Sequence, residues 1–191
     1  MTATDTEPRK VVLFSGHMID APDRKAPRFP PDKQSVARAA IAALLAQLDA
    51  GPQDLAISSA ACGGDLLFAE AALARGTRLE LYLPFDRATF ARESVDFAGG
   101  DWHARFKAAC AASRLHLMPA ERGALAAGAN PYVLNNLWML EAASRWGAEK
   151  VDVVCLWNGQ GGDGPGGTQH LMDQVRRQRG RAHWLDTSRL W

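Results

Sequence analysis

Four short segments of the chain carry residues that could bind an anion or a nucleobase. The first is Ser15-Gly16-His17, which directly follows the apolar residues 11–14. A glycine at this place lets a ligand approach the backbone, and the Ser15 hydroxyl or the His17 imidazole could bond a phosphate or a base. A tight turn with a surface histidine explains the same residues, so both interpretations stay open.

The second segment, residues 61–65, places two adjacent glycines, Gly63 and Gly64, before a predicted helix. Small residues that open a helix offer unpaired N–H groups and the positive end of the helix dipole, which suits a phosphate. Asp65 could instead be the N-cap of that helix. Glu70 is either a surface residue or a carboxylate directed at a ribose. If the protein is an enzyme, Glu70 and Asp65 are the candidate catalytic groups.

The third segment opens the clearest predicted helix. Asn130 fits the N-cap position and Pro131 the first helical position. Asn135 and Asn136 are poor helix formers inside an amphipathic pattern, so we expect at least one of them to be there for hydrogen bonding. A ligand and a neighbouring loop are both possible partners for these amides.

The fourth segment is the glycine-rich run between Trp157 and Thr168, in which residues 158–167 include six glycines. It follows an apolar run and precedes a helix, a context in which glycine brings backbone N–H groups against a phosphate. We therefore expect Gly166, Gly167 and Thr168 to bind phosphate. The run matches neither G-x-x-x-x-G-K-[ST] nor G-x-G-x-x-G, which disfavours a P-loop NTPase and a standard dinucleotide dehydrogenase. A surface loop with Thr168 as a helix N-cap is the alternative.

The elements that must position these segments alternate between strand and helix. Strands are predicted at 10–16, 54–60, 78–84, 114–118, 151–157 and 181–185, and helices at 33–49, 66–75, 86–92, 102–112, 131–146 and 168–179. This alternation predicts an α/β fold, a single doubly wound Rossmann-like domain with a mainly parallel sheet of about six strands. Ligands bind at the carboxyl ends of the strands in such sheets, where all four segments begin. The proline-rich loop 17–32 carries Arg24 and Arg28 and is predicted to close over the ligand.

Length and composition are those of one globular domain. The chain has 191 residues, 47% of them hydrophobic and 23% charged, and a formal net charge of +1. We expect residues 10–191 to form the single domain and residues 1–9 to be a flexible N-terminal segment. The near-zero charge makes nucleic acid an unlikely partner, although an arginine cluster at 176–181 keeps a nucleic-acid-binding role as the weakest alternative.

The sequence also favours a cytoplasmic protein without a metal or cofactor. No apolar run approaches the ~18–20 residues that cross a bilayer, so no membrane association is expected. The three cysteines, Cys62, Cys110 and Cys155, are widely spaced in apolar surroundings, which predicts small core residues rather than a disulfide framework or a metal site. Five tryptophans supply more indole than a core of this size needs and suggest a possible homodimer: Trp102, Trp138, Trp146, Trp184 and Trp191.

The order of the motifs resembles the SLOG superfamily, the Rossmann-like group that includes DNA-processing protein A domains, LOG phosphoribohydrolases and nucleotide-sensing domains. The resemblance rests on Phe14-Ser15-Gly16-His17, Ala61-Cys62-Gly63-Gly64-Asp65 with Glu70, Leu83-Pro84-Phe85, Tyr132 with Asn135 and Asn136, and Trp157-Asn158-Gly159 followed by Gly166-Gly167-Thr168. It implies a nucleotide or nucleotide-derived ligand, phosphate on Gly166, Gly167 and Thr168, and a contact from Tyr132. It also implies a sensor or signalling domain with a possible separate effector.

One motif departs from the LOG enzymes, whose P-G-G-x-G-T-x-x-E pattern ends in a glutamate that takes part in N-glycosidic cleavage. Here the run is Pro165-Gly166-Gly167-Thr168-Gln169-His170-Leu171, so Leu171 stands where that glutamate would be. A ligand-binding domain is therefore the leading hypothesis. The alternative is a hydrolase or transferase that acts at the N-glycosidic bond of a nucleoside or nucleotide.

Overall fold

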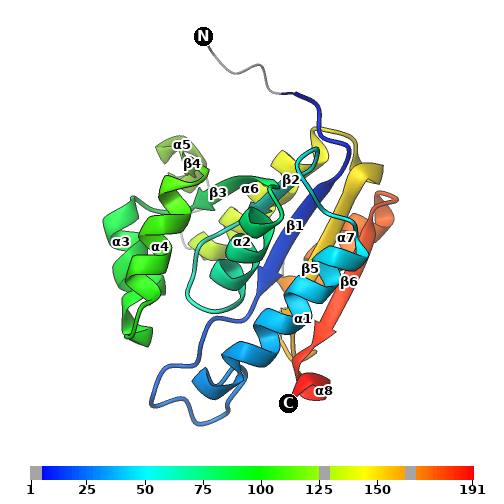
Figure 1. Cartoon of the computed structure of the whole chain (residues 1–191). Helices are drawn as coiled ribbons and strands as arrows, with labels where there is room; N and C mark the ends of the chain where they lie inside the picture. Colours follow the sequence, from blue (N-terminus) through cyan, green and yellow to red (C-terminus); the bar gives the residue numbers. More distant parts are fainter. Residues whose placement is uncertain (1–5, 125–129, 162–166) are drawn as a thin grey trace.

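A single six-stranded parallel sheet organises the chain. The structure is a computed structural model and describes residues 6–124, 130–161 and 167–191 (Figure 1). The strands lie in the order β4-β3-β2-β1-β5-β6, and each neighbouring pair is parallel. Their bounds are β1 Val11–Gly16, β2 Leu55–Ser58, β3 Arg78–Leu83, β4 Arg114–Leu117, β5 Val151–Trp157 and β6 Arg181–Asp186. The predicted fold class is confirmed.

Helices cover both faces of the sheet. They are α1 Gln34–Gln47, α2 Gly64–Ala74, α3 Arg87–Ser94, α4 Trp102–Ala111, α5 Ala120–Ala124, α6 Pro131–Ser144, α7 Thr168–Arg177 and α8 Thr187–Leu190, with 3-10 turns at Pro31–Lys33, Asp96–Ala98 and Ala148–Lys150. Figure 1 shows α1 and α2 in front of the sheet and α6 and α7 behind it. The sequence did not predict α5 and α8, because helices this short contain too few residues for a 3.6-residue period to emerge.

The central strands are apolar without alternation because both of their faces are buried. In β1, Val12 and Phe14 belong to the core cluster under α1 and α2, whereas Val11 and Leu13 belong to the cluster under α6 and α7. All four side chains are fully buried. This two-sided burial is what a parallel sheet in a three-layer domain requires.

The strand order reverses between β1 and β5. From β1 the sheet extends through β2 and β3 to β4 on one side, and through β5 to β6 on the other. The two neighbours of β1 are reached through helices on opposite faces, which leaves a crevice beyond its carboxyl end. The residues after β1 and β2 are therefore placed beside one another.

The proline-rich loop after β1 is fixed by the carboxylate of Asp20. Its Oδ2 accepts hydrogen bonds from the backbone N–H groups of Arg28 and Phe29, each at 2.8 Å, and its Oδ1 lies 3.0 Å from Nε of Arg24. The Phe29 ring is fully buried and stacks on Trp191 at a centroid distance of 5.2 Å. These contacts close the loop on itself.

At the amino ends of the strands, Arg9 bonds the buried carboxylate of Asp54 at 2.8 and 3.0 Å, and Lys150 pairs with Glu7.

The three cysteines are buried and unbonded to one another, as predicted. Among the helices formed by the described residues, none combines the length and hydropathy needed to span a bilayer.

Candidate functional site

A cavity of about 250 Å³ lies beyond the carboxyl ends of β1 and β2, and we call it the switch-point cavity. It is lined by Ser15, Gly16, Met18, Ser59, Ala61, Asp65, Tyr132, Val133, Asn135, Asn136, Met139, Gly167 and Thr168. Eight of the residues predicted from the sequence are brought together here: Ser15, Gly16, Asp65, Tyr132, Asn135, Asn136, Gly167 and Thr168. Other cavities are larger but more open and lie away from this edge of the sheet.

Five lining residues were not among the predicted ligand contacts: Met18, Ser59, Ala61, Val133 and Met139. Ser59 and Ala61 belong to the small-residue turn after β2, so their position was a usable signal. Val133 and Met139 were indistinguishable from ordinary core residues, because helical spacing does not tell which apolar side chains end at a cavity.

His17, Gly63 and Gly64 do not line the cavity, and their backbones hold two loops together. Gly63 has φ +103°, and a Cβ there would lie 2.6 Å from the backbone nitrogen of Ile19. The N–H of Gly64 donates to the backbone oxygen of His17 at 3.0 Å. The glycine pair therefore permits close packing between the segments after β1 and β2.

The imidazole of His17 is buried beside Asn158. Its Nε2 lies 3.2 Å from the backbone nitrogen of Asn158, which donates to it, and 3.2 Å from the Asn158 side-chain oxygen. Burial lowers the pKa of His17 to about 4, so the ring is neutral near pH 7. A neutral ring that accepts a backbone hydrogen bond links the ends of β1 and β5.

Asp65 is not the N-cap of α2, which corrects one of the two sequence interpretations. Gly63 occupies the N-cap, and Asp65 lies in the first turn. Its Oδ2 accepts a hydrogen bond from the backbone N–H of Ala61 at 3.3 Å. Burial raises the pKa of Asp65 to about 7, because a single hydrogen bond compensates little of the lost hydration. A carboxyl group that can gain or lose a proton near neutral pH therefore lines the cavity.

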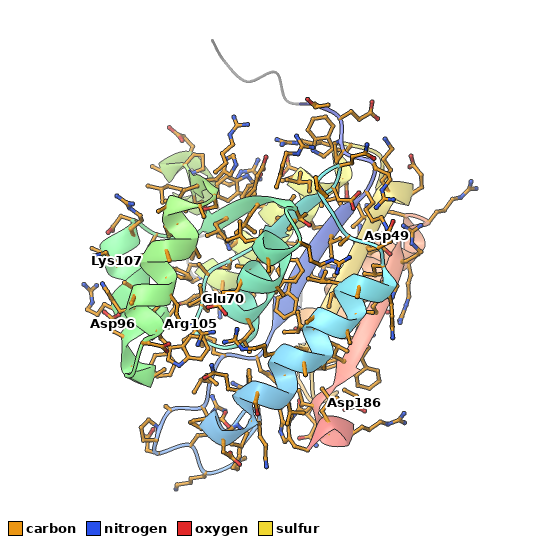
Figure 2. The ribbon with its side chains drawn as sticks, viewed as in Figure 1. Asp49, Glu70, Asp96, Arg105, Lys107 and Asp186 are labelled. Carbon is orange, nitrogen blue, oxygen red and sulfur yellow. The ribbon has the colours of Figure 1, made fainter. Side chains whose placement is uncertain are left out.

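Glu70 lies outside the cavity lining and joins three helices on the outer surface. Its carboxylate bonds Arg105 of α4 at 2.5 and 3.0 Å and Arg38 of α1 at 2.8 Å. Figure 2 shows Glu70 and Arg105 directed toward one another from α2 and α4. The guanidinium of Arg105 also lies 3.8 Å from the centre of the Trp102 ring. Both carboxylate oxygens are therefore engaged by arginines.

The start of α6 forms as its sequence predicts. The Asn130 side chain accepts from the backbone N–H of Tyr132 at 2.9 Å, with Pro131 in the first turn. The Tyr132 hydroxyl lies 2.8 Å from that of Ser94. These contacts fix the Tyr132 side chain, which lines the cavity and has about a third of its surface exposed.

Asn135 leaves one hydrogen-bond acceptor unused inside the protein. Its Nδ2 donates to the backbone oxygen of Tyr82 at 2.9 Å, which fixes the orientation of the amide. Among the described residues, the remaining Oδ1 has no hydrogen-bond partner, and the residue is 2% exposed. A buried acceptor without a partner costs free energy unless something else supplies the donor.

Helix α7 begins at the cavity. Gly167 is its N-cap with no side-chain capping bond, and the N–H of Leu171 makes the first intrahelical bond, to the Gly167 oxygen at 2.9 Å. The N–H groups of the first turn therefore have no intrahelical partner. Leu171, at the position of the LOG glutamate, is fully buried under α6. Gly166, also predicted to bind phosphate, lies outside the described residues.

No family model matches the chain. A search of curated proteins finds no match either. Among solved structures, the chain is similar to the Moco carrier protein from Chlamydomonas reinhardtii, with 11% sequence identity, a TM-score of 0.37 and coverage of 94% of this chain and 91% of that one. A likeness this weak carries no argument about function, which must come from the residues of the cavity.

The charge of the switch-point cavity is unusual for an anion site. Its described lining contains one ionisable carboxyl group, Asp65, and neither lysine nor arginine. Within the described part of the chain, no group of three or more histidine, cysteine, aspartate or glutamate side chains could hold a metal ion. Residues from the first turns of α2, α6 and α7 line the cavity, so the N-termini of these helices supply positive potential there.

Proposed function

We propose that the chain binds a nucleotide or nucleotide-derived small molecule in the switch-point cavity, as a SLOG-like domain. One juxtaposition carries the proposal: the start of α7, at Gly167 and Thr168, borders the same cavity as the polar residues Ser15 and Asp65. The helix start offers backbone N–H donors to an anion, and the Ser15 hydroxyl and the Asp65 carboxyl could bond a polar group of the same molecule. A ligand with a phosphate at one end and a hydrogen-bonding ring at the other satisfies both.

The place of the cavity in the fold supports this proposal. Doubly wound sheets bind ligands outside the carboxyl ends of their strands, at the reversal of strand order, and here Ser15 and Gly16 end β1 at that point. Apolar surface from Met18, Val133 and Met139 lies beside the polar groups. A mixture of apolar walls and a few polar anchors is typical of small-molecule sites.

A binding domain that acts as a sensor is the function we favour over an enzyme. The position that carries the glutamate in LOG enzymes is Leu171, whose side chain is in the core. A sensor of this kind would pass its signal to a separate effector or to a second copy of the chain. We propose residues 10–191 as the single nucleotide-binding unit.

One observation favours an N-glycosidic hydrolase or transferase as the second candidate. Asp65 lines the cavity and its pKa is raised to about 7 by burial, so it could donate or accept a proton at neutral pH. In that case Asp65, rather than Glu70, is the catalytic candidate, because both oxygens of Glu70 are bonded to arginines.

Thermal-shift and calorimetric titration with nucleoside monophosphates tests the proposal. We expect binding to the wild-type chain and its loss in Gly167→Val, because a branched side chain at the start of α7 occupies the place of the anion. Gly51→Val is the matched control, since a Cβ at Gly51 meets no atom within 4 Å and the residue is remote from the cavity.

Chromatography of the titrated mixture separates the two candidates. Recovery of the intact nucleotide supports a sensor, and release of a free base supports the enzyme. If Gly167→Val folds and binds with unchanged affinity, the anion does not contact the start of α7, and the proposed function fails in this form.

A further inference from the structure

Three helices begin at the switch-point cavity. Its lining includes Asp65 from the first turn of α2, Tyr132 and Val133 from that of α6, and Thr168 from that of α7. The N-terminus of each helix is the positive end of its dipole. The described lining contains no lysine or arginine. An anion in this cavity is therefore attracted by backbone dipoles and not by a charged side chain.

Asp65 supplies the carboxyl group of the described lining. The residue is 9% exposed, and among the described residues its carboxyl group has one hydrogen bond, from the Ala61 N–H to Oδ2 at 3.3 Å. Oδ1 has no such bond and, in contrast to Oδ1 of Asn135, is not one of the fully buried side-chain atoms that lack a partner. Oδ1 is therefore the oxygen with which Asp65 can contact a ligand.

An ionised Asp65 would oppose an anion in this cavity. The carboxyl group is largely shielded from water, where like charges repel more strongly than in bulk solvent, and the described lining offers no basic side chain between them. A neutral carboxyl group removes the repulsion and gains one O–H donor. Because Oδ2 accepts the Ala61 N–H, the proton lies on Oδ1.

The ionisable side chains nearest Asp65 do not provide a counter-charge. Burial raises the pKa of the Cys62 thiol to about 12 and lowers the pKa of His17 to about 4, so both groups are neutral near pH 7. The Tyr132 hydroxyl is hydrogen-bonded to that of Ser94. Burial therefore dominates at Asp65 and raises its pKa to about 7.

The charged residues on the elements packed against α2 are directed elsewhere. Arg38 of α1 and Arg105 of α4 bond Glu70, which does not line the cavity. Strands β1 and β2 contain no charged residue. In β3, Arg78 lies at the amino end of the strand, and the carboxylate of Glu80 accepts a bond from a tyrosine in the cluster under α6.

From this geometry, and resting on the proposed function, we infer that Asp65 binds the anionic group of the ligand as a neutral carboxylic acid and donates the hydrogen on Oδ1 to it. Where Asp65 is ionised in the free protein, binding takes up one proton from solvent, which forms the O–H bond. The other atoms of the carboxyl group and of the ligand keep their covalent bonds. Affinity for an anionic ligand is therefore coupled to pH through this side chain.

Calorimetric titration of wild type and Asp65→Asn with AMP at pH 6, 7 and 8 tests the inference. The amide keeps an oxygen for the Ala61 N–H, offers an N–H donor to the ligand and stays neutral at every pH. We expect the ratio of dissociation constants, wild type over Asp65→Asn, to rise about ten-fold from pH 6 to pH 8. The phosphate of AMP also titrates near pH 6, but it does so with both proteins and cancels in the ratio.

A second measurement counts the proton. Titration at pH 8 in Tris and in HEPES, two buffers with different enthalpies of ionisation, gives the number of protons taken up per AMP bound. We expect nearly one proton more for wild type than for Asp65→Asn. Asp101→Asn is the matched control, because Asp101 precedes α4 outside the cavity with a side chain that is 75% exposed, and it should behave as wild type.

The Asp65→Ala variant separates donation from mere neutrality. It removes both the charge and the donor, so AMP should bind at least five-fold more weakly to it than to Asp65→Asn at each pH. Equal affinity of the two folded variants would overturn the donated hydrogen bond.

The other outcomes separate this inference from the proposed function. A ratio that does not change with pH, or equal proton uptake by wild type and Asp65→Asn, would overturn the inference and leave nucleotide binding intact. Absence of AMP binding to wild type at pH 6 would overturn the inference as well, because Asp65 is then neutral. Absence of binding of every nucleoside monophosphate would overturn the proposed function itself.

Discussion

The backbone of Ile19 lies directly against Gly63, so closely that a Cβ at Gly63 would be 2.6 Å from the Ile19 nitrogen. Met18 and Gly63 form an isolated antiparallel bridge, and the N–H of Ile19 donates to the oxygen of Cys62 at 3.1 Å. Since Met18 lines the switch-point cavity, this contact sets the position of one of its walls against the start of α2.

We expect Gly63→Ala to destabilise the protein by about 1–3 kcal/mol more than Gly99→Ala. Both glycines have positive φ angles, +103° and +65°, so an alanine at either position is strained by a similar backbone free energy. A Cβ at Gly99, however, meets no atom within 4 Å, whereas that at Gly63 meets backbone. Urea denaturation of the two variants measures the difference. Equal losses of stability in the two variants would show that the loops after β1 and β2 can move apart without a cost in free energy.

We expect Glu70→Gln to lower the free energy of unfolding by about 1–3 kcal/mol and to leave nucleotide affinity unchanged. The substitution weakens the charged bonds to Arg38 and Arg105, whereas Glu70 does not line the cavity. Chemical denaturation and calorimetry measure the two quantities. Loss of affinity or of base release in a folded variant would return Glu70 to the site.

The matched control for Glu70→Gln is Glu141→Gln. Glu141 also pairs with an arginine, Arg122, but its side chain is 64% exposed against 27% for Glu70. Exposed pairs contribute about 0–1 kcal/mol, so the control should show a smaller loss of stability.

Asp65 should make the stability of the protein fall as pH rises from about 4 to about 7. Its pKa in the folded state, about 7, lies above the ordinary value of 3.8, so over this range the folded protein keeps a proton that the unfolded chain releases. The contribution is fully present below pH 4 and lost above pH 7, at a cost of roughly 4 kcal/mol at most. Asp65→Asn should therefore have a higher Tm than the wild type at pH 8.

The comparison is the difference between the Tm values of Asp65→Asn and wild type, measured by differential scanning calorimetry at pH 5, 6, 7 and 8. Other titrating groups affect both proteins alike and cancel. We expect the difference to grow with pH up to about 7 and then to level off. A difference that does not change with pH would mean that Asp65 is ionised throughout this range.

The proline-rich loop should resist trypsin with or without a nucleotide, because Asp20 already holds it closed. Arg24, Lys25 and Arg28 are the potential cleavage sites, and none of them lines the cavity. Asp20→Ala removes three contacts and should accelerate cleavage at these sites at least several-fold. Protection of the wild-type loop by a bound nucleotide would instead support the closing movement predicted from the sequence.

The sequence by itself determined the layout of the fold. Apolar runs of strand length separated by amphipathic segments specify a parallel sheet covered on two faces, because only two-sided burial makes a strand such as residues 11–16 apolar without alternation. The sequence also predicted Asn130 as the N-cap of α6 and Pro131 as its first residue, because helix capping depends on neighbouring residues alone. The grouping of Ser15, Asn135 and Thr168 followed from the position of each after a strand or at a helix start.

Only the tertiary structure decided what the individual groups contact. The pair Gly63 and Gly64 is typical of a phosphate-binding turn. In the structure, however, the backbone of residues 17–19 packs against both glycines and fills the space that a phosphate would need. Glu70 and Asp65 are five residues apart on one helix, yet arginines of α1 and α4 engage the first and burial raises the pKa of the second. Burial and long-range partners arise from segments distant in sequence, and a local pattern does not contain them.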